Sequence, residues 1–313
     1  MLADAPLFAD LAEGPAGARA FWLRAGDGVQ LRVGHFPSEG GKGTVLLFPG
    51  RTEYIEKYGR TAADLAQRGY HTLTIDWRGQ GLADRLLDDK LAGHVHHFDD
   101  YQKDVAAMLD AARDLDLPRP FHLLAHSMGG CIGLRAVLSG LPAASATFSA
   151  PMWGIAMSGP LRPAAWALSW SGAALGFGHV YTPGTRPSSY VNSEPFAGNL
   201  LTRDEEMWNY MRAQTEAQPE LQLGGPSLRW LHQALSECRA LAQRPSPTLP
   251  CLTLAGTAEA IVDADRIAER MDRWPGGAME WIEGGQHECL MEDRATRTRL
   301  ADRLVAHFGA TTA

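Results

Sequence analysis

One serine of the chain lies in a setting that could make it a nucleophile. Residues 121–131 read Phe-His-Leu-Leu-Ala-His-Ser-Met-Gly-Gly-Cys, so a short apolar run passes through a small-x-Ser-x-Gly sequence into a helical pattern. A serine at a sharp strand-to-helix turn projects its hydroxyl from the edge of a sheet, where a base can remove its proton. The sequence therefore predicts Ser127 as a nucleophile, with Ala125 at the position that glycine usually takes.

A serine nucleophile needs a base, and His287 is the candidate. It lies in Glu283-Gly-Gly-Gln-His-Glu288, directly after a predicted strand. Imidazole titrates near neutral pH, so it can accept and return a proton. Because the chain has 11 histidines, the position of His287 rather than its residue type favours it.

The acid that orients the base has two candidates. Glu259 lies three residues after Gly256, where a predicted strand ends, and Asp263 lies seven residues after it. Either carboxylate could hold the imidazole in the correct tautomer. We favour Glu259 and keep Asp263 as the alternative acid. In both cases the chain order is serine, acid, histidine, which is typical of an α/β-hydrolase sheet.

Two backbone N–H groups are predicted to bind the oxyanion. One belongs to Met128, directly after the nucleophile, and the other to Arg51, in the loop after the first core strand. Gly50 would allow a close approach there. For the Arg51 side chain we expect a solvated or salt-bridged surface group, and the alternative is a contact with an anionic head group such as a phosphate.

Other polar motifs are interpreted as structural. His94, His96 and His97 have no spacing that suits a common zinc loop. His126 is expected to pack beside the nucleophile, the alternative being a second base, and Arg78 is expected in an ion pair behind the site. No phosphate-binding or dinucleotide-binding glycine motif occurs in the sequence, so no cofactor and no metal are predicted.

Short strands alternate with helical patterns over most of the chain. A hairpin over 21–36 is followed by predicted strands at 44–48, 71–76, 121–126, 145–150, 251–256 and 279–283. Helices are predicted at 53–68, 99–115, 200–213, 227–241, 265–271 and 294–308. This alternation predicts an α/β fold with a mostly parallel central sheet and helices on both faces.

The alternation stops between Pro151 and about Arg244. This stretch holds five of the nine tryptophans and no clear strand pattern. We therefore divide the chain into residues 1–151, the first part of an α/β-hydrolase core, residues 152–244, an inserted and mainly helical cap, and residues 245–313, the second part of the core.

Composition limits the partners. A net charge of −7 argues against a nucleic-acid binder, which needs a basic surface. Four cysteines without paired spacing and an N-terminus without a secretory pattern predict a cytoplasmic protein. The most apolar stretch, residues 163–178, is shorter than the roughly 20 residues that span a bilayer. It fits either a buried helix or a lid in weak contact with a membrane surface.

Several further segments recur together in one group of enzymes: Phe48-Pro-Gly-Arg-Thr-Glu53 with Lys57-Tyr58, Asp76-Trp-Arg-Gly-Gln-Gly81, His97-Phe-Asp-Asp-Tyr-Gln-Lys-Asp-Val105, His126-Ser-Met-Gly-Gly130 and Ser149-Ala-Pro-Met152. On these segments the chain resembles the monoacylglycerol lipase and lysophospholipase branch of the α/β-hydrolase superfamily, the serine-aminopeptidase-like hydrolases. The resemblance covers nearly all of the core. It implies a Ser127–acid–His287 triad, a cap over the acyl site and hydrolysis of lipid-like esters without a cofactor.

The sequence departs from that family in three places. Ala125 replaces a glycine, Pro49-Gly50 stands where relatives often have His-Gly, and Glu259 occupies a position that is usually aspartate. The last departure leaves the identity of the acid open between Glu259 and Asp263.

Three functions remain in competition. The leading hypothesis is a serine carboxylic-ester hydrolase acting on monoacyl lipids. A small-peptide or amide hydrolase would need carboxylates in the cap to bind a free amino group, and Glu194, Glu205 and Glu206 could supply them. The third is a non-catalytic ligand-binding protein on a hydrolase scaffold. The sequence determines neither acyl length, head group nor oligomeric state.

Overall fold

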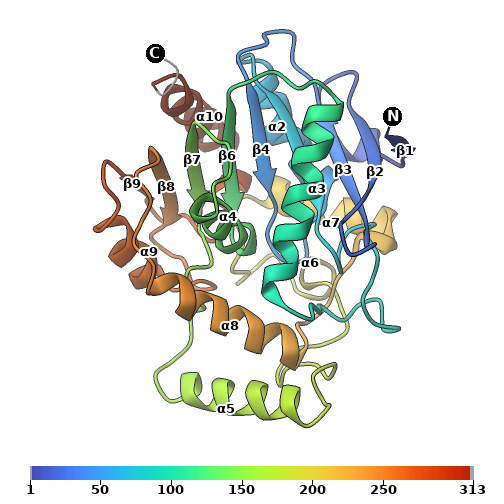
Figure 1. Cartoon of the computed structure of the whole chain (residues 1–313), viewed down its shortest axis with the longest axis vertical. Coiled ribbons are helices and arrows are strands. Elements are labelled where there is room, and N and C mark those ends of the chain that lie inside the picture. Colours follow the sequence, from blue (N-terminus) through green and yellow to red (C-terminus); the bar gives the residue numbers. More distant parts are fainter. Residues whose placement is uncertain (1, 311–313) are drawn as a thin grey trace.

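A mixed β-sheet forms the centre of the molecule (Figure 1). The computed structural model describes residues 2–310, and within them nine strands pair in the order β1-β2-β3-β5-β4-β6-β7-β8-β9. Strands β1 to β3 pair antiparallel, β3 is antiparallel to β5, and the pairs from β5 to β9 are parallel. The strands are β1 (Ala3–Ala5), β2 (Arg19–Arg24), β3 (Gln30–Phe36), β4 (Thr44–Phe48), β5 (His71–Asp76), β6 (Phe121–His126), β7 (Ser145–Ser149), β8 (Cys251–Gly256) and β9 (Ala278–Ile282).

Helices connect the parallel strands, as the alternation predicts. The α-helices are α1 (Ala9–Ala12), α2 (Gly59–Ala66), α3 (Tyr101–Asp114), α4 (Met128–Leu138), α5 (Leu161–Ala174), α6 (Tyr190–Ser193), α7 (Glu205–Ala217), α8 (Leu228–Ala242), α9 (Ala264–Met271) and α10 (Arg294–Gly309). Short 3₁₀ helices occur at η1 (Ile55–Tyr58), η2 (Phe98–Asp100), η3 (Pro219–Leu221) and η4 (Cys289–Met291). The predicted fold class is confirmed.

The central strands are apolar throughout because both faces of the sheet are buried. In β4, Leu46 and Phe48 join one hydrophobic cluster, which includes residues of α3, α4 and α9. Val45 and Leu47 point to the opposite face, where they join a cluster with residues of α2 and α10. Successive side chains of a strand alternate between faces, so a strand covered on both sides needs apolar residues at every position.

Two predicted helices differ from the observed ones. The helix expected over 200–213 begins only at Glu205, because Asn199 Oδ1 accepts the N–H groups of Leu201 and Thr202 and holds a turn there. Asp204 then caps α7 by accepting the N–H of Met207 at 2.7 Å. The helix expected over 53–68 is divided into η1 and α2.

The turn after β5 is held by ion pairs, as predicted for Arg78. Its guanidinium donates to Asp104 at 2.7 Å and to Asp27 at 2.8 Å. Both contacts tie the end of β5 to neighbouring elements behind the site. The chain therefore leaves the sheet at Asp76 in a fixed direction.

Helices α5 to α8 lie between β7 and β8 in the sequence, and in space α5 and α8 lie at one end of the molecule while α7 packs near η1. Figure 1 shows the central strands pointing toward the end where α5 and α8 lie. Helix α5 packs on α8, and a Cβ at Gly172 would lie only 2.6 Å from the Leu228 side chain, so the two helices approach closely. No helix in residues 2–310 has the length and apolarity needed to cross a bilayer.

Candidate active site

Ser127 occupies a strained turn between β6 and α4. Its φ is 50° and ψ is −118°, a conformation that L-residues rarely adopt. The turn is fixed by backbone hydrogen bonds: the Ser127 N–H donates to Ser149 O at 3.0 Å, and the Ser127 carbonyl accepts from Gly130 and Met152 at 2.8 Å each. Such strain persists only where the surroundings impose it, and it turns the hydroxyl away from the sheet.

Small residues around the turn allow helix and sheet to approach. A Cβ at Gly129 would lie 2.1 Å from the Phe48 carbonyl oxygen, so no larger residue fits there. The methyl of Ala125 fits because Gly133 faces it: a Cβ at Gly133 would lie 3.1 Å from the Ala125 Cβ. The departure from glycine at position 125 is therefore accommodated by a glycine on α4.

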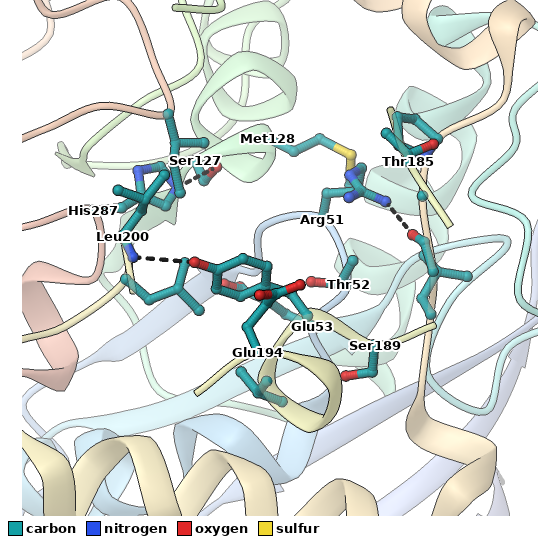
Figure 2. Close-up of a pocket in the computed structure, with 18 of the residues that line it drawn as sticks. Arg51, Thr52, Glu53, Ser127, Met128, Thr185, Ser189, Glu194, Leu200 and His287 are labelled. Carbon is teal, nitrogen blue, oxygen red and sulfur yellow. Dashed lines mark hydrogen bonds between the residues drawn. The ribbon is translucent and has the colours of Figure 1, made fainter. Parts of the chain in front are cut away.

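Ser127, His287 and Glu259 form a hydrogen-bonded chain. His287 Nε2 lies 2.9 Å from Ser127 Oγ, across 160 residues of sequence (Figure 2). His287 Nδ1 lies 2.8 Å from Glu259 Oε2. Because a carboxylate can only accept, Nδ1 carries the hydrogen and donates it, which leaves Nε2 free to accept from the serine hydroxyl.

Glycines join the loops that carry the acid and the base. A Cβ at Gly256 would lie 1.9 Å from the Gly285 carbonyl oxygen, so the end of β8 touches the histidine loop. The Ala258 N–H donates to the same carbonyl at 2.9 Å. Glu288, next to the histidine, donates its N–H to Leu201 O at 2.8 Å, so residues before α7 also hold this loop.

Glu259 is buried and ionised. Its Oε1 accepts the N–H groups of Ile261 at 2.6 Å and Val262 at 3.1 Å, while Oε2 faces His287. Burial by itself raises the pKa of Glu259, but these hydrogen bonds outweigh it and bring the pKa below its usual value. The carboxylate is therefore negative at neutral pH.

The alternative acid, Asp263, is engaged elsewhere. It is the N-cap of α9 and accepts the N–H of Arg266, and its Oδ2 pairs with Arg162 Nη2 at 2.9 Å. The structure brings Glu259, and not Asp263, into hydrogen-bonding contact with His287. An aspartate that precedes a helical pattern is a common N-cap, and that signal was present in the sequence.

The predicted oxyanion donors lie beside the serine. A Cβ at Gly50 would lie 3.0 Å from the Ser127 Cβ, which shows how closely the loop after β4 approaches. The Gly50 N–H itself donates to the Glu53 carboxylate. Met128 is the first residue of α4, where N–H groups have no partner within the helix. Within residues 2–310, the Arg51 N–H donates to no protein acceptor.

A buried cluster of charged side chains packs against these loops, and the sequence pattern did not predict it. Lys57 Nζ bonds Glu53 Oε1 at 2.5 Å and Glu288 Oε1 at 2.6 Å. His126 Nε2 lies 3.3 Å from Glu288 Oε2 and 3.5 Å from Glu53 Oε1. The cluster connects the loop after β4, the end of β6 and the residue after His287. The i, i+4 spacing of Glu53 and Lys57 was its only local signal.

His126 is the packing residue we expected rather than a second base in contact with Ser127. Its Nδ1 donates to Ser149 O at 3.0 Å, and its ring centroid lies 4.8 Å from that of His287. Burial lowers the pKa of His126, but the carboxylates of Glu288 and Glu53 outweigh burial and raise it above the usual value. The two carboxylates thus favour the protonated form of the imidazole that lies next to His287.

Two groups of side chains consist of residue types that can bind a metal ion. Glu53, His126 and Glu288 could each offer one ligand atom, and these atoms lie within 4.8 Å of one another. Lys57 bonds both carboxylates, however, so an ammonium already takes the place of a cation. His94 Nδ1 lies 2.9 Å from Ser227 Oγ, which fits the structural role predicted for it.

The Arg51 side chain contradicts our leading expectation. Its Nη1 donates to the Gly224 carbonyl at 2.8 Å, and its guanidinium lies 5.5 Å from the Trp230 ring centroid. Within the described residues it forms no ion pair, and it lines a pocket rather than the outer surface. Burial lowers the pKa of Arg51 to about 10, so it still carries its charge at neutral pH.

A pocket of about 530 Å³ opens over Ser127 and His287. Its volume is within the range of small-molecule sites, which are mostly apolar with a few polar groups. Most of the apolar side chains that line it come from residues between β7 and β8, and the others from α4 and the loop after β8: Met152, Ile155, Val191, Leu200, Leu201, Met211, Leu223, Trp230, Leu231, Met128, Ile261 and Val262. In Figure 2, Ser127 and His287 lie on one side of the pocket, and Thr185 and Ser189 on the other.

The sheet topology and the strained strand-to-helix turn at Ser127 define an α/β-hydrolase. The family model for serine aminopeptidase, S33, matches residues 40–294. Lysophospholipase L2 of Escherichia coli (strain K12) is 32% identical over 292 residues, covering 90% of this chain and 85% of that protein. The chain belongs to the serine aminopeptidase, S33, family and is a serine hydrolase.

Solved structures agree on the fold. A soluble variant of monoglyceride lipase from Saccharomyces cerevisiae superposes with a TM-score of 0.72 at 19% identity, covering 92% of this chain and 94% of that one. Monoacylglycerol lipase from Paleococcus ferrophilus gives a TM-score of 0.68 at 19% identity, covering 88% and 99%. The predicted resemblance to the monoacylglycerol lipase and lysophospholipase branch is confirmed.

Proposed function

We propose that this chain hydrolyses carboxylic esters of monoacyl lipids, as a lysophospholipase or monoacylglycerol lipase does. The observation that carries the proposal is the hydrogen-bonded chain Ser127–His287–Glu259 at the floor of an apolar pocket. The names of the relatives support the same substrate class.

In the proposed reaction, Ser127 Oγ attacks the ester carbonyl while His287 Nε2 accepts its proton. The proton is then given to the leaving alcohol, which leaves an acyl-serine. Water, deprotonated by His287, attacks the acyl group and releases the fatty acid and the free serine. Glu259 keeps the Nδ1–H tautomer and stabilises the imidazolium. The Arg51 and Met128 N–H groups bind the oxyanion, each lowering the barrier by about 2.7 to 4 kcal/mol.

We propose that residues 152–244 act as a cap over the acyl chain. Leu200, Met211 and Leu231 line the pocket from this segment, while Ile261 and Val262 line it from the loop that carries Glu259. Apolar side chains contributed by both segments suit a hydrocarbon chain, because each buried methylene contributes about 0.8 kcal/mol.

An active-site label tests the mechanism. A fluorophosphonate should attach once, at Ser127, and block hydrolysis of a monoacylglycerol with a matching acyl chain. Ser127→Ala should lose both labelling and hydrolysis, whereas Ser149→Ala, a neighbouring serine that packs on His126, should keep the label. Labelling of a different serine would end the proposal.

An aminopeptidase-like activity is the second candidate, supported by the family description and by one carboxylate. Glu194 is exposed at the pocket, where it could bind a substrate amino group. Glu206, by contrast, pairs with Arg60. Comparing p-nitrophenyl esters with aminoacyl anilides decides between the two. We expect ester hydrolysis to dominate, and a higher kcat/KM for the anilides would reverse the assignment.

We also propose that α5 touches lipid surfaces. Trp170 on α5 and Leu175 and Phe177 directly after it are more than half exposed, and Arg162 is the only charged residue of the helix. Such a face binds lipid by apolar burial rather than by charge. Cosedimentation with neutral phosphatidylcholine vesicles should therefore fall for Trp170→Ser with Leu175→Ser, and equal binding by this variant would contradict the idea.

A further inference from the structure

Arg51 presents unused hydrogen-bond donors to the pocket. A guanidinium has five N–H donors, and within the described residues only Nη1 has an acceptor, the Gly224 carbonyl. The nitrogen atoms Nε and Nη2 have no protein partner, yet they are not among the fully buried unpaired atoms of the described chain. They are therefore reachable from the pocket that Arg51 lines.

Two buried arginines in the molecule have more hydrogen-bond acceptors than Arg51, which is only partly buried. Arg32 donates to the carboxylates of Glu56 and Asp76, and both side chains that accept are fully buried. Arg270 has no carboxylate either, but it donates to the Leu241 and Arg244 carbonyls and to a serine hydroxyl. Arg51 has one hydrogen-bond acceptor, the Gly224 carbonyl, and lies over the Trp230 ring. Its remaining N–H donors therefore lack acceptors in the described part of the chain.

The charges around Arg51 leave it without a counter-ion. Among the carboxylates of the pocket, Glu53 and Glu288 are both bonded to Lys57. Glu194 lies exposed at the opening and forms no ion pair within residues 2–310. On the side that Figure 2 labels Thr185 and Ser189, the pocket offers hydroxyl groups and backbone. An anion that binds beside Arg51 would accept two charge-assisted hydrogen bonds from the guanidinium in a bidentate geometry.

The position of Arg51 fits the length of one substrate class. Its backbone N–H is the proposed oxyanion donor for the ester carbonyl. Only the three methylenes of the Arg51 side chain separate that backbone from the guanidinium. In a monoacyl glycerophospholipid, the phosphate is separated from the ester carbonyl by a single glycerol unit. Phosphate and guanidinium can therefore meet while the carbonyl lies at Ser127.

We propose that the Arg51 guanidinium binds the phosphate of a monoacyl glycerophospholipid, which makes it a specificity-determining residue favouring lysophospholipids over monoacylglycerols. The inference rests on the proposed ester-hydrolase function. The backbone of Arg51 serves catalysis for any ester, whereas its side chain selects the head group.

The test is a ratio of two activities measured on the same enzyme. The substrates are 1-octanoyl-glycerol and 1-octanoyl-glycerophosphoethanolamine, used as monomers, and the ratio is kcat/KM of the second to that of the first. Arg51→Met should lower this ratio by about 10- to 100-fold, mostly through KM, because one charged contact of this kind is lost. Arg51→Lys keeps the charge and should retain a larger ratio than the methionine variant. Added NaCl should lower the wild-type ratio.

Arg270→Met is the matched control. Like Arg51, Arg270 donates to a carbonyl and lies over a tryptophan, Trp153, but it is more deeply buried and does not line the pocket. Its loss should change stability and leave the ratio unaltered. Fluorophosphonate labelling of Ser127 checks that each variant keeps a reactive site.

The outcomes separate the two proposals. If the wild type hydrolyses neither ester, the proposed function fails. If it hydrolyses both but the ratio is the same in Arg51→Met as in the wild type, only the role of Arg51 fails. Should the methionine variant not fold, the lysine variant and the salt dependence decide, and a wild-type ratio that is insensitive to NaCl overturns the inference.

Discussion

Replacing Glu259 by glutamine should trap His287 in the wrong tautomer. Glu259 Oε1 accepts two backbone N–H groups, from Ile261 and Val262, while Oε2 faces His287 Nδ1 at 2.8 Å. A glutamine must place its carbonyl oxygen toward the two N–H groups, because an amide nitrogen there would meet donors with donors. Its NH₂ then faces Nδ1, which must become an acceptor.

The consequence reaches the nucleophile through the ring. If Nδ1 accepts, the proton of neutral His287 resides on Nε2, 2.9 Å from Ser127 Oγ, and the imidazole can no longer accept the serine proton. An aspartate-to-asparagine change in this role costs about 10⁴ in kcat, which corresponds to about 5 to 6 kcal/mol of barrier. We expect Glu259→Gln to have an effect of that size.

The assay is kcat for a p-nitrophenyl ester, with stability followed by urea unfolding. Glu259→Gln should unfold near the wild-type midpoint, because its shape is kept. The matched variant is Asp263→Asn, which perturbs the cap of α9 and the contact to Arg162 and should change kcat less than tenfold. Glutamine activity within tenfold of wild type, or a 10⁴-fold loss in Asp263→Asn, would refute the reasoning.

Three further predictions follow from packing and charge. Gly50→Ala places a methyl 3.0 Å from the Ser127 Cβ and should lower kcat by up to about 10²-fold by shifting an oxyanion donor; unchanged burst kinetics would contradict this. Glu288 and Glu53 raise the pKa of His126 above its usual 6.5, so the stability that His126 contributes should fall as the pH rises above that value, and His126→Gln should remove this part of the pH dependence in urea unfolding; an unchanged pH dependence in the variant would contradict this account. Arg32→Met leaves two fully buried carboxylates without their partner and should cost about 3 to 5 kcal/mol in urea unfolding, and a loss below about 1 kcal/mol would be too small for this account.

Predictions that succeeded rest on local patterns. The strands 44–48, 71–76, 121–126 and 251–256 were predicted with their observed bounds, since each is a short apolar run between turn residues. The helix expected over 200–213 was misplaced at its start because the Asn199 turn and the Asp204 cap bind local backbone that the apolar pattern does not describe.

The sequence by itself determined the α/β alternation, the serine at the turn after β6 and the histidine after β9, because strand length, glycine placement and chain order are local properties. Only the tertiary structure decided which carboxylate faces His287, since Glu259 and Asp263 differ in the backbone N–H groups that their loop presents to them. Likewise, Arg51 is a pocket cation rather than a surface group because the Gly224 carbonyl and Trp230, far along the chain, fold over it. Contacts between distant segments set the burial and charge of a side chain, and no local pattern encodes them.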